Sequence, residues 1–140
     1  MIVVDVIGGP PVLAAYLNER IGLPFSSDTR CLGVMRRDLS IAGAVAYNGW
    51  LEDSVFMHVH FESHAVSREA LREAFMYPFV TCNKKRVYGM TPITSQRALV
   101  FSKRLGFREL QRTPDFLLQV MSREECRWIN DAADNSGTSA

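Results

Sequence analysis

The chain has 140 residues, a length that fits one domain and leaves little room for two independent cores. Its 16 basic and 15 acidic residues give a net charge of +1, so no overall field attracts nucleic acid or anionic lipid. Its three cysteines follow no zinc-like or disulfide-like spacing, and no apolar stretch approaches the ~20 residues that cross a bilayer. These features predict a cytoplasmic protein without a membrane span, and they argue against a nucleic-acid partner.

The first third of the chain predicts a strand, a helix and two further strands. Residues 2–7 are a β-branched run that ends in a Gly-Gly-Pro-Pro turn. Apolar residues then recur at helical spacing over residues 13–21, until a glycine and a proline stop the helix. Two short apolar runs follow, at residues 31–37 and 41–47, and we expect them to pair as antiparallel strands.

The middle of the chain predicts a strand with two unlike faces and then a kinked helix. The strand covers residues 55–62 and reads VFMHVHFE. Alternation places its apolar side chains on one face and its polar side chains on the other, with Met57, Val59 and Phe61 opposite His58, His60 and Glu62. Ser67 can cap a helix that runs to about residue 84, and Pro78 should kink it because proline lacks a backbone N–H.

The last part of the chain predicts three strands and two helices. The strands are at residues 86–93, 107–112 and 116–121, and the helices are at residues 95–105 and 123–132. Strand and helix alternate in this half of the chain, which predicts parallel pairing through right-handed crossovers. Together with the antiparallel meander in the first half, this order predicts a mixed sheet.

The segment RVYGMTPITSQRALVFSKRLGFREL, residues 86–110, resembles the GNAT superfamily of N-acetyltransferases. In that family a helix with a pattern like N-x-x-A-x-x-x-Y-x-x-x-G-F leads into the next strand. The residues of this chain that meet the pattern are Ala98, Leu105, Gly106 and Phe107. The preceding segment FMYPFVTCNKKRV resembles a phage-type subset of the family, one that is often found in phage genomes.

The order of elements also resembles that of the GNAT family across nearly the whole chain. The resemblance implies an α/β (α+β) fold with a mixed, mostly antiparallel central sheet, helices on both faces and a splayed central strand pair. By the same resemblance, the opening between these strands lies between residues 59–61 and 89–91. We expect one GNAT-like domain over residues 1–132 and a flexible C-terminal tail at 133–140, where the sequence is small and polar.

The sequence departs from the family pattern at three places. The family usually carries a glycine-rich turn before the helix that follows its fourth strand, and residues 63–68 contain no glycine. Ser95 replaces the asparagine of the family helix, and Ser102 falls where a general-acid tyrosine is frequent. A thiolate leaving group has a low enough pKa to depart without an acid, so the last change is compatible with catalysis.

The resemblance implies acetyl-CoA as the co-substrate. The residues that it places near this molecule are Phe61, Ser63, Ser67, Arg68, Ser95 and Arg97. The helix that begins after Ser67 would direct its backbone amides at phosphate, and Arg68 would add charge. The alternative is that Ser67 is an ordinary N-cap and that Arg68 and Arg97 are solvated surface arginines.

The candidate catalytic residues are Glu62, His60 and Ser102. Glu62 or His60 could be the general base near neutral pH, directly or through water. The alternative is that the histidines of this strand are satisfied core or edge residues, and no fourth ligand is evident for a metal site. Ser102 could meet the cofactor thiol, although inward serines commonly bond the carbonyl one turn back.

These patterns predict an acyl-CoA-dependent N-acetyltransferase that moves an acetyl group to a primary amine by direct attack. The acceptor is either a small-molecule amine or a protein amine. The sequence is compatible with a homodimer. The alternative function is a catalytically degenerate GNAT-fold module for binding or assembly, of phage origin. The glycine-free loop and Ser102 favour the module, whereas the polar strand face and the Leu-Gly-Phe turn favour the enzyme.

Overall fold

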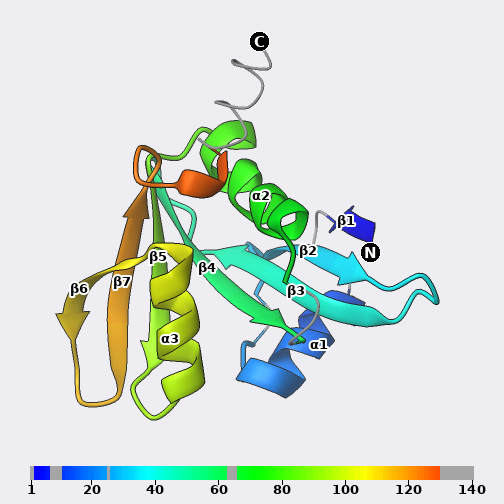
Figure 1. Ribbon diagram of the computed structural model, residues 1–140, viewed down its shortest axis with the longest axis horizontal. Coiled ribbons are helices and arrows are strands. Elements are labelled where there is room, and N and C mark those ends of the chain that lie inside the picture. The colour runs from blue at the N-terminus through cyan, green and yellow to red at the C-terminus, as the bar shows by residue number, and fades with distance from the viewer. Residues whose placement is uncertain (1, 7–10, 25, 63–65, 130–140) are drawn as a thin grey trace. The chain divides into compact units, whose positions relative to one another are not determined.

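The structure is a computed structural model that describes residues 2–6, 11–24, 26–62 and 66–129 (Figure 1). The chain divides into two compact units. The first consists of Met1–Leu51 and Phe56–Ala74, and the second of Glu52–Val55 and Phe75–Ala140. The single domain over residues 1–132 stays a prediction, and the tail at 133–140 lies outside the described residues.

The first unit is built on an antiparallel meander. Its strands are β1 (Ile2–Val6), β2 (Arg30–Met35), β3 (Ile41–Asn48) and β4 (Ser54–Phe61). Each strand pairs with the next one along the chain, in antiparallel register. The antiparallel pairing predicted for the first half of the sequence is therefore confirmed.

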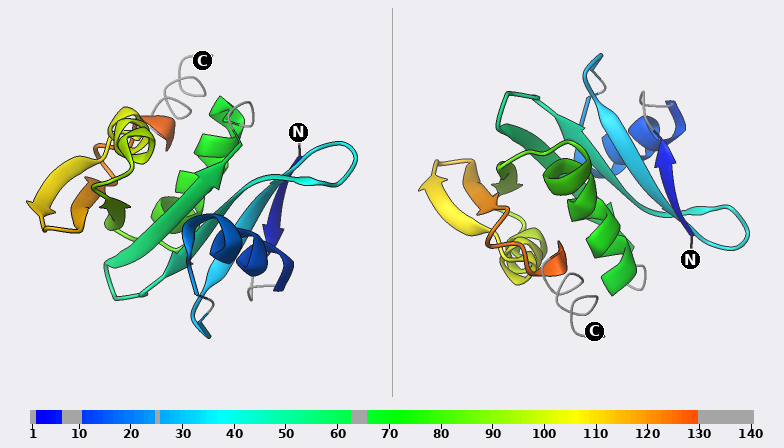
Figure 2. Two further views of the ribbon diagram at one scale, coloured as in Figure 1. Left: turned by 90° about the horizontal axis from the view of Figure 1, so that it is seen from below. Right: turned by 90° about the horizontal axis from the view of Figure 1, so that it is seen from above.

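Two helices cover opposite faces of this meander (Figure 2). Helix α1 (Pro11–Ile21) packs on β2 and β3, where its buried residues form a core cluster that is made of Leu13, Tyr16, Leu17, Cys31, Ala44 and Ala46. Helix α2 (Arg68–Met76) reaches the other face of β3, where the Tyr47 hydroxyl donates a hydrogen bond to the Ala74 carbonyl over 2.5 Å. Small residues on β3 let α1 approach closely, and the prediction of helices on both faces is confirmed for this unit.

A π-helical turn, η1 (Tyr77–Thr81), continues α2 and explains the Tyr47 contact. Pro78 has no N–H, so it cannot donate to the carbonyl of Ala74 four residues earlier. The Tyr47 hydroxyl supplies that missing hydrogen bond, and both Tyr47 and Pro78 are fully buried. Sequence predicted one helix to about residue 84 with a kink at Pro78; instead, α-helical geometry ends at Met76 and a wider turn follows.

The second unit contains three antiparallel strands. Its strands are β5 (Arg86–Pro92), β6 (Arg108–Arg112) and β7 (Phe116–Ser122). Strand β7 lies between the other two and is antiparallel to both. The prediction of parallel neighbours is therefore wrong for these strands, because the chain reverses after β6 and inserts β7 beside β5.

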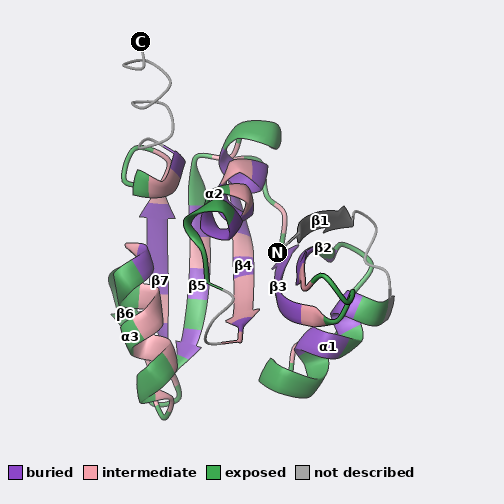
Figure 3. Cartoon of the chain, turned by 45° about the vertical axis from the view of Figure 1, so that its right-hand side comes forward, coloured by how far each residue is buried: buried purple, intermediate pink, exposed green. Residues whose placement is uncertain are grey.

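Helix α3 (Gln96–Leu105) connects β5 to β6 as the sequence predicted. Ser95 is its N-cap, and Gly106 ends it in the left-handed conformation with φ of 112°. Aromatic residues fill the core of this unit, where the ring of Phe75 lies 6.3 Å from Phe79 and 6.2 Å from Phe107. All five residues of β6 are exposed (Figure 3).

Two remaining expectations concern the ends of the structure and the central strands. Of the last helix predicted at residues 123–132, residues 127–129 are helical and residues 123–125 form a turn. The splay of a central strand pair stays a prediction. Within the described part of the chain, no helix has both the length and the apolar character that a membrane span requires.

Candidate functional site

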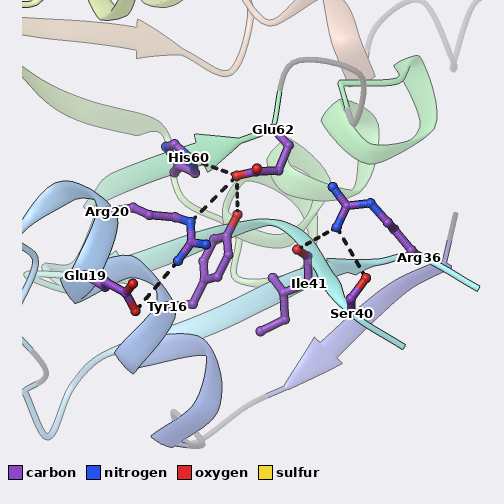
Figure 4. A network of polar contacts seen from close by, with 8 residues as sticks. All are labelled: Tyr16, Glu19, Arg20, Arg36, Ser40, Ile41, His60 and Glu62. Atoms are coloured by element: carbon purple, nitrogen blue, oxygen red, sulfur yellow. Dashed lines mark hydrogen bonds and ion pairs between the residues drawn. The ribbon is translucent and has the colours of Figure 1, made fainter. Parts of the chain in front are cut away.

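A polar cluster in the first unit joins α1 to the end of β4 (Figure 4). It consists of Tyr16, Arg20, His60 and Glu62, and we call it the Glu62 cluster. Tyr16 and Arg20 lie one helical turn apart on α1, so their side chains share a face. The Glu62 N–H donates to the Ala42 carbonyl over 2.8 Å and so continues the β-ladder by one residue beyond β4. His60 and Glu62, two residues apart along this strand, therefore lie on the same face.

Two hydrogen-bonding groups and one cation converge on one oxygen of Glu62. The Tyr16 hydroxyl donates to Oε2 over 2.9 Å, His60 Nε2 lies 3.2 Å from the same atom, and Arg20 Nε lies 3.7 Å away. About a third of each of the His60, Glu62 and Arg20 side chains is exposed, at 32%, 34% and 35%. The cluster is therefore ordered by internal contacts and still open to solvent.

The electrostatics of the cluster fix where its protons lie. The hydrogen bonds from Tyr16 and His60 hold the pKa of Glu62 below its ordinary value. Burial, helped by the hydrogen bond to Glu62, raises the pKa of Tyr16 to about 12. At neutral pH the carboxylate is ionised and accepts only, so a neutral His60 ring carries its proton on Nε2 and leaves Nδ1 as a basic nitrogen.

His58, the third polar residue of the predicted strand face, lies apart from this cluster. Its Nε2 is 2.9 Å from the side-chain oxygen of Asn48, and burial lowers the pKa of His58. The structure therefore brings His60 and Glu62 together and gives His58 a separate partner. Among the described residues, no group of three or more His, Cys, Asp or Glu side chains is placed to hold a metal ion.

Phe61 and Ser63 were predicted next to the cofactor. Phe61 is buried, and its ring covers the backbone of Gly43 so closely that a Cβ at Gly43 would lie 2.3 Å from Phe61 Cδ1. The ring of Phe61 is thus a packing element, and its role towards a cofactor stays a prediction. Ser63 lies outside the described residues.

Ser67 and Arg68 begin helix α2. The Ser67 hydroxyl accepts a hydrogen bond from the Ala70 N–H over 3.0 Å, which confirms its predicted role as an N-cap. Arg68, the first residue of the helix, is exposed. The backbone of the first turn of a helix is suited to an anion, and the role of Arg68 towards a cofactor stays a prediction.

Ser95 and Arg97 occupy the corresponding place on α3. The Ser95 hydroxyl accepts from the Ala98 N–H over 3.3 Å, so its side chain is used as a cap. Arg97 is exposed in the first turn of this helix. The structure thus gives Ser95 a structural partner, while the roles of both residues towards a cofactor stay predictions.

Ser102 belongs to a buried polar chain that sequence reasoning missed. The Ser102 hydroxyl donates to the Leu99 carbonyl over 3.1 Å and accepts from Gln119 Nε2 over 2.9 Å. The Thr91 hydroxyl in turn donates to Gln119 Oε1 over 2.8 Å. Both residues are buried. Thr91 lies on β5 and Gln119 on β7, and these two strands are paired. The proton of Ser102 is therefore already engaged within the second unit.

The α1 half of the Glu62 cluster was also missed. Helical spacing assigned Tyr16 to the buried stripe, and it is indeed buried, but its hydroxyl reaches out to Glu62. A tyrosine among aliphatic inward residues is the signal that could have indicated a polar partner, because a buried phenol needs one. The identity of that partner, 46 positions away, does not follow from local sequence.

No family profile matches the chain, and no curated protein matches it in sequence. Solved structures do share its architecture. The N152L mutant of spermidine N-acetyltransferase SpeG from Vibrio cholerae is 13% identical, with a TM-score of 0.69 over 94% of this chain and 97% of that one. The N-acetyltransferase PseH from Campylobacter jejuni, in complex with acetyl coenzyme A, is 13% identical, with a TM-score of 0.58 over 78% and 76%. Apo FdhC, described as a nucleotide-linked sugar GNAT, is 11% identical, with a TM-score of 0.63 over 87% and 68%.

Proposed function

Because the chain has the fold of the GNAT N-acetyltransferases, we propose that it transfers an acetyl group from acetyl-CoA to a primary amine. The observation that carries the proposal is the fold, which is shared with SpeG over 94% of this chain. The Glu62 cluster adds the acid–base group that such a reaction needs. The acceptor is a small-molecule or protein amine, and pairing of two chains as a homodimer stays a prediction.

His60 is the proposed general base. A primary amine is protonated near neutral pH and must lose a proton before its nitrogen can attack a carbonyl carbon. Glu62 holds the Nε2 proton of His60 at 3.2 Å, which leaves Nδ1 to accept the amine proton. The carboxylate then stabilises the imidazolium that forms, and the Tyr16 hydroxyl keeps Glu62 in place. Sequence alone left Glu62 and His60 as equal candidates for the base, and this geometry favours His60.

Acetyl-CoA supplies the activated acetyl group as a thioester. Nitrogen attack forms the amide bond, the C–S bond breaks, and CoA leaves as a thiolate that solvent or the imidazolium can protonate. A thiolate can leave without being protonated by a general acid, so we assign no proton transfer to Ser102. The hydroxyl proton of Ser102 is donated to the Leu99 carbonyl. A contact of Ser102 with the thiol stays a prediction.

The pyrophosphate of CoA is proposed to lie at the start of α2. The positive end of the helix dipole and the Arg68 guanidinium suit an anion there. The Ser67 hydroxyl contributes indirectly, because its bond to the Ala70 N–H keeps the first turn in shape. Phe61 is also proposed to contact the cofactor. Ser95 and Arg97, at the start of α3, are proposed cofactor-binding residues as well.

A second candidate function is a GNAT-fold module that binds or assembles without turnover. Two observations favour it. Residues 63–68 lack the glycines that let backbone amides approach a pyrophosphate, and Ser102 stands where a tyrosine is frequent in the family. This candidate predicts a stable fold that neither binds acetyl-CoA nor releases thiol.

Thermal denaturation with acetyl-CoA, followed by a turnover assay, separates these two functions. A ligand at 100 times its dissociation constant stabilises the folded state by about 2.7 kcal/mol, which is several degrees for a small domain. Thiol release with a panel of primary amines then measures transfer. Absence of both the shift and thiol release at millimolar acetyl-CoA favours the binding module.

The base assignment is tested by His60→Ala. Loss of a general base typically lowers turnover by about 10²–10⁴-fold, and we expect a loss in this range with the melting temperature nearly kept. His58→Ala is the matched control, since His58 lies on the same strand face but contacts Asn48 instead. Equal turnover of the two variants would remove His60 from the mechanism.

A further inference from the structure

The guanidinium of Arg20 is held loosely at the Glu62 cluster. Its Cζ lies 3.9 Å from the centre of the Tyr16 ring, and its Nε lies 3.7 Å from Glu62 Oε2. The remaining contact, from Nη1 to Glu19 Oε2, is 4.0 Å long. The guanidinium thus lies over the Tyr16 ring with the carboxylates of Glu19 and Glu62 nearby. Neither of its two ion pairs is short enough for a hydrogen bond.

Arg36, drawn beside the cluster in Figure 4, shows the contrast. Its Nη1 donates to the Ile41 carbonyl over 3.1 Å and to the Ser40 hydroxyl over 3.3 Å. Arg36 is therefore tied to the backbone of its own hairpin, whereas among the described residues Arg20 is held by its ion pairs and the Tyr16 ring. Of these two neighbouring cations, Arg20 is the one that a competitor can displace.

The surface beneath Arg20 has the chemistry of a cation site. Proteins recognise organic cations with an aromatic face and a nearby carboxylate, and Tyr16 with Glu62 supplies both. The tyrosine keeps its proton at neutral pH because its pKa is raised, and the carboxylate is ionised because its pKa is lowered. Tyr16, His60 and Arg20 all contact Oε2 of Glu62, so Oε1 is the oxygen that we assign to a ligand N–H.

We propose that Tyr16 and Glu62 form a binding site for the alkylammonium group of a ligand, and that Arg20 is an internal placeholder that leaves when the ligand binds. The ammonium replaces the guanidinium on the Tyr16 ring and donates to Glu62 Oε1. This inference rests on the proposed function in one respect, namely that the bound ammonium is the acceptor amine in the protonated form in which it arrives. His60 contacts the same carboxylate through Nε2, so the proposed base and the proposed cation site share Glu62.

If Arg20 is a placeholder, its removal should have a different effect on ligand binding than the removal of a structural arginine. Exposed ion pairs and exposed cation–π contacts are weak, so removing Arg20 should cost little stability. It frees the ring and the carboxylate, and alkylammonium binding should tighten by about threefold to tenfold, the factor that one such contact represents. A structural Arg20 would instead organise the site, and its removal would weaken binding.

The test is a titration of the full chain with n-butylammonium at neutral pH, without acetyl-CoA, followed by calorimetry or by NMR shifts of His60 and Tyr16. Arg20→Ala should bind more tightly than the wild type, whereas Glu62→Gln should bind at least about tenfold more weakly, since it loses the charge. Tyr16→Phe should keep most of the affinity because the ring remains. Arg37→Ala is the matched control, because it removes one exposed positive charge elsewhere in the same unit. n-Butanol controls for the apolar chain and should not bind.

Equal or weaker binding by Arg20→Ala than by Arg37→Ala overturns the proposal, as does unchanged binding by Glu62→Gln. Circular dichroism melts of each variant exclude loss of folding as the cause. The outcome is independent of the acetyltransferase assignment, which is decided by the acetyl-CoA shift and by thiol release. A chain that binds butylammonium in this pattern but not acetyl-CoA keeps the cation site and loses the proposed reaction.

Discussion

The hydroxyl group of Tyr47 stabilises the C-terminal end of α2. It donates to the Ala74 carbonyl, to which Pro78 cannot donate because proline has no N–H. We expect Tyr47→Phe to lower the free energy of unfolding by about 1–3 kcal/mol, because it leaves a buried carbonyl unsatisfied. Urea denaturation measures the change.

The double variant Tyr47→Phe/Pro78→Ala provides the control for this account. Alanine at position 78 restores the N–H that Ala74 lacks, so part of the loss should be recovered. The two substitutions should therefore be non-additive, since they act on one carbonyl. Strict additivity would show that the hydroxyl stabilises the chain in some other way.

Tyr16 and Glu62 titrate as partners. Burial is the largest cause of the raised Tyr16 pKa of about 12, and the hydrogen bond and negative charge of Glu62 raise it further. Glu62→Gln removes that charge, so ionisation of Tyr16 becomes easier and its pKa should fall towards 10.0 while staying above it. Ultraviolet absorbance of tyrosinate follows the titration, and Tyr16→Phe identifies the signal. A pKa that rises in the Gln variant would contradict the recorded contact.

Local sequence could predict the residues that share a face or cap a helix. Ser67 caps α2 as expected, and Ser95 and Gly106 cap α3, because a cap depends on a few neighbouring residues. Strand alternation placed His60 beside Glu62 for the same reason. Tyr16 escaped the prediction as a site residue, because its partner comes from a distant strand and no spacing encodes that meeting.

Among the elements, β3 depends on a close approach that sequence only suggested. Gly43 lies under the Phe61 ring, and a Cβ there would be 2.3 Å from Cδ1 and 3.1 Å from the His60 carbonyl oxygen. Gly43→Ala should therefore destabilise the chain by about 1–3 kcal/mol, the usual cost of overpacking. Gly89→Ala is the matched control on β5, since its Cβ would meet Phe107 at an ordinary 3.6 Å. Equal chemical denaturation midpoints for the two variants would contradict the tight contact.

The order of the strands was harder to predict than their existence. Strands β5 and β7 follow from their own apolar patterns, whereas all five residues of β6 are exposed, and α3 was predicted to within one residue of its observed start. Which strands become neighbours is decided by packing between distant segments. Thus the insertion of β7 beside β5 had no local signal, whereas Pro78 predicted a kink at Tyr77–Thr81 but not its π-helical geometry.

At the scale of the molecule, carboxylates with lowered pKa values couple stability to pH. Hydrogen bonds from Ser26 and Gly49 lower the pKa of Asp28, and those from Ser122 lower that of Glu125, so both units are affected. A lowered folded-state pKa gives stability that is present above the unfolded values, 3.8 for Asp and 4.5 for Glu, and is lost below them. Urea unfolding should therefore show a falling free energy as the pH drops from about 6 to about 3. A flat or rising curve would contradict the assigned hydrogen bonds.

The buried chain from Thr91 through Gln119 to Ser102 also constrains how the gene can change. Replacing Gln119 by an apolar residue would leave the buried Thr91 hydroxyl without its acceptor and take one donor from Ser102, while replacing either hydroxyl would leave part of the amide unsatisfied. Each single step passes through a less stable protein, so the three codons form one evolutionary unit. In a lineage of such chains, these positions should be exchanged as a set, from a polar trio to an apolar one, rather than one at a time.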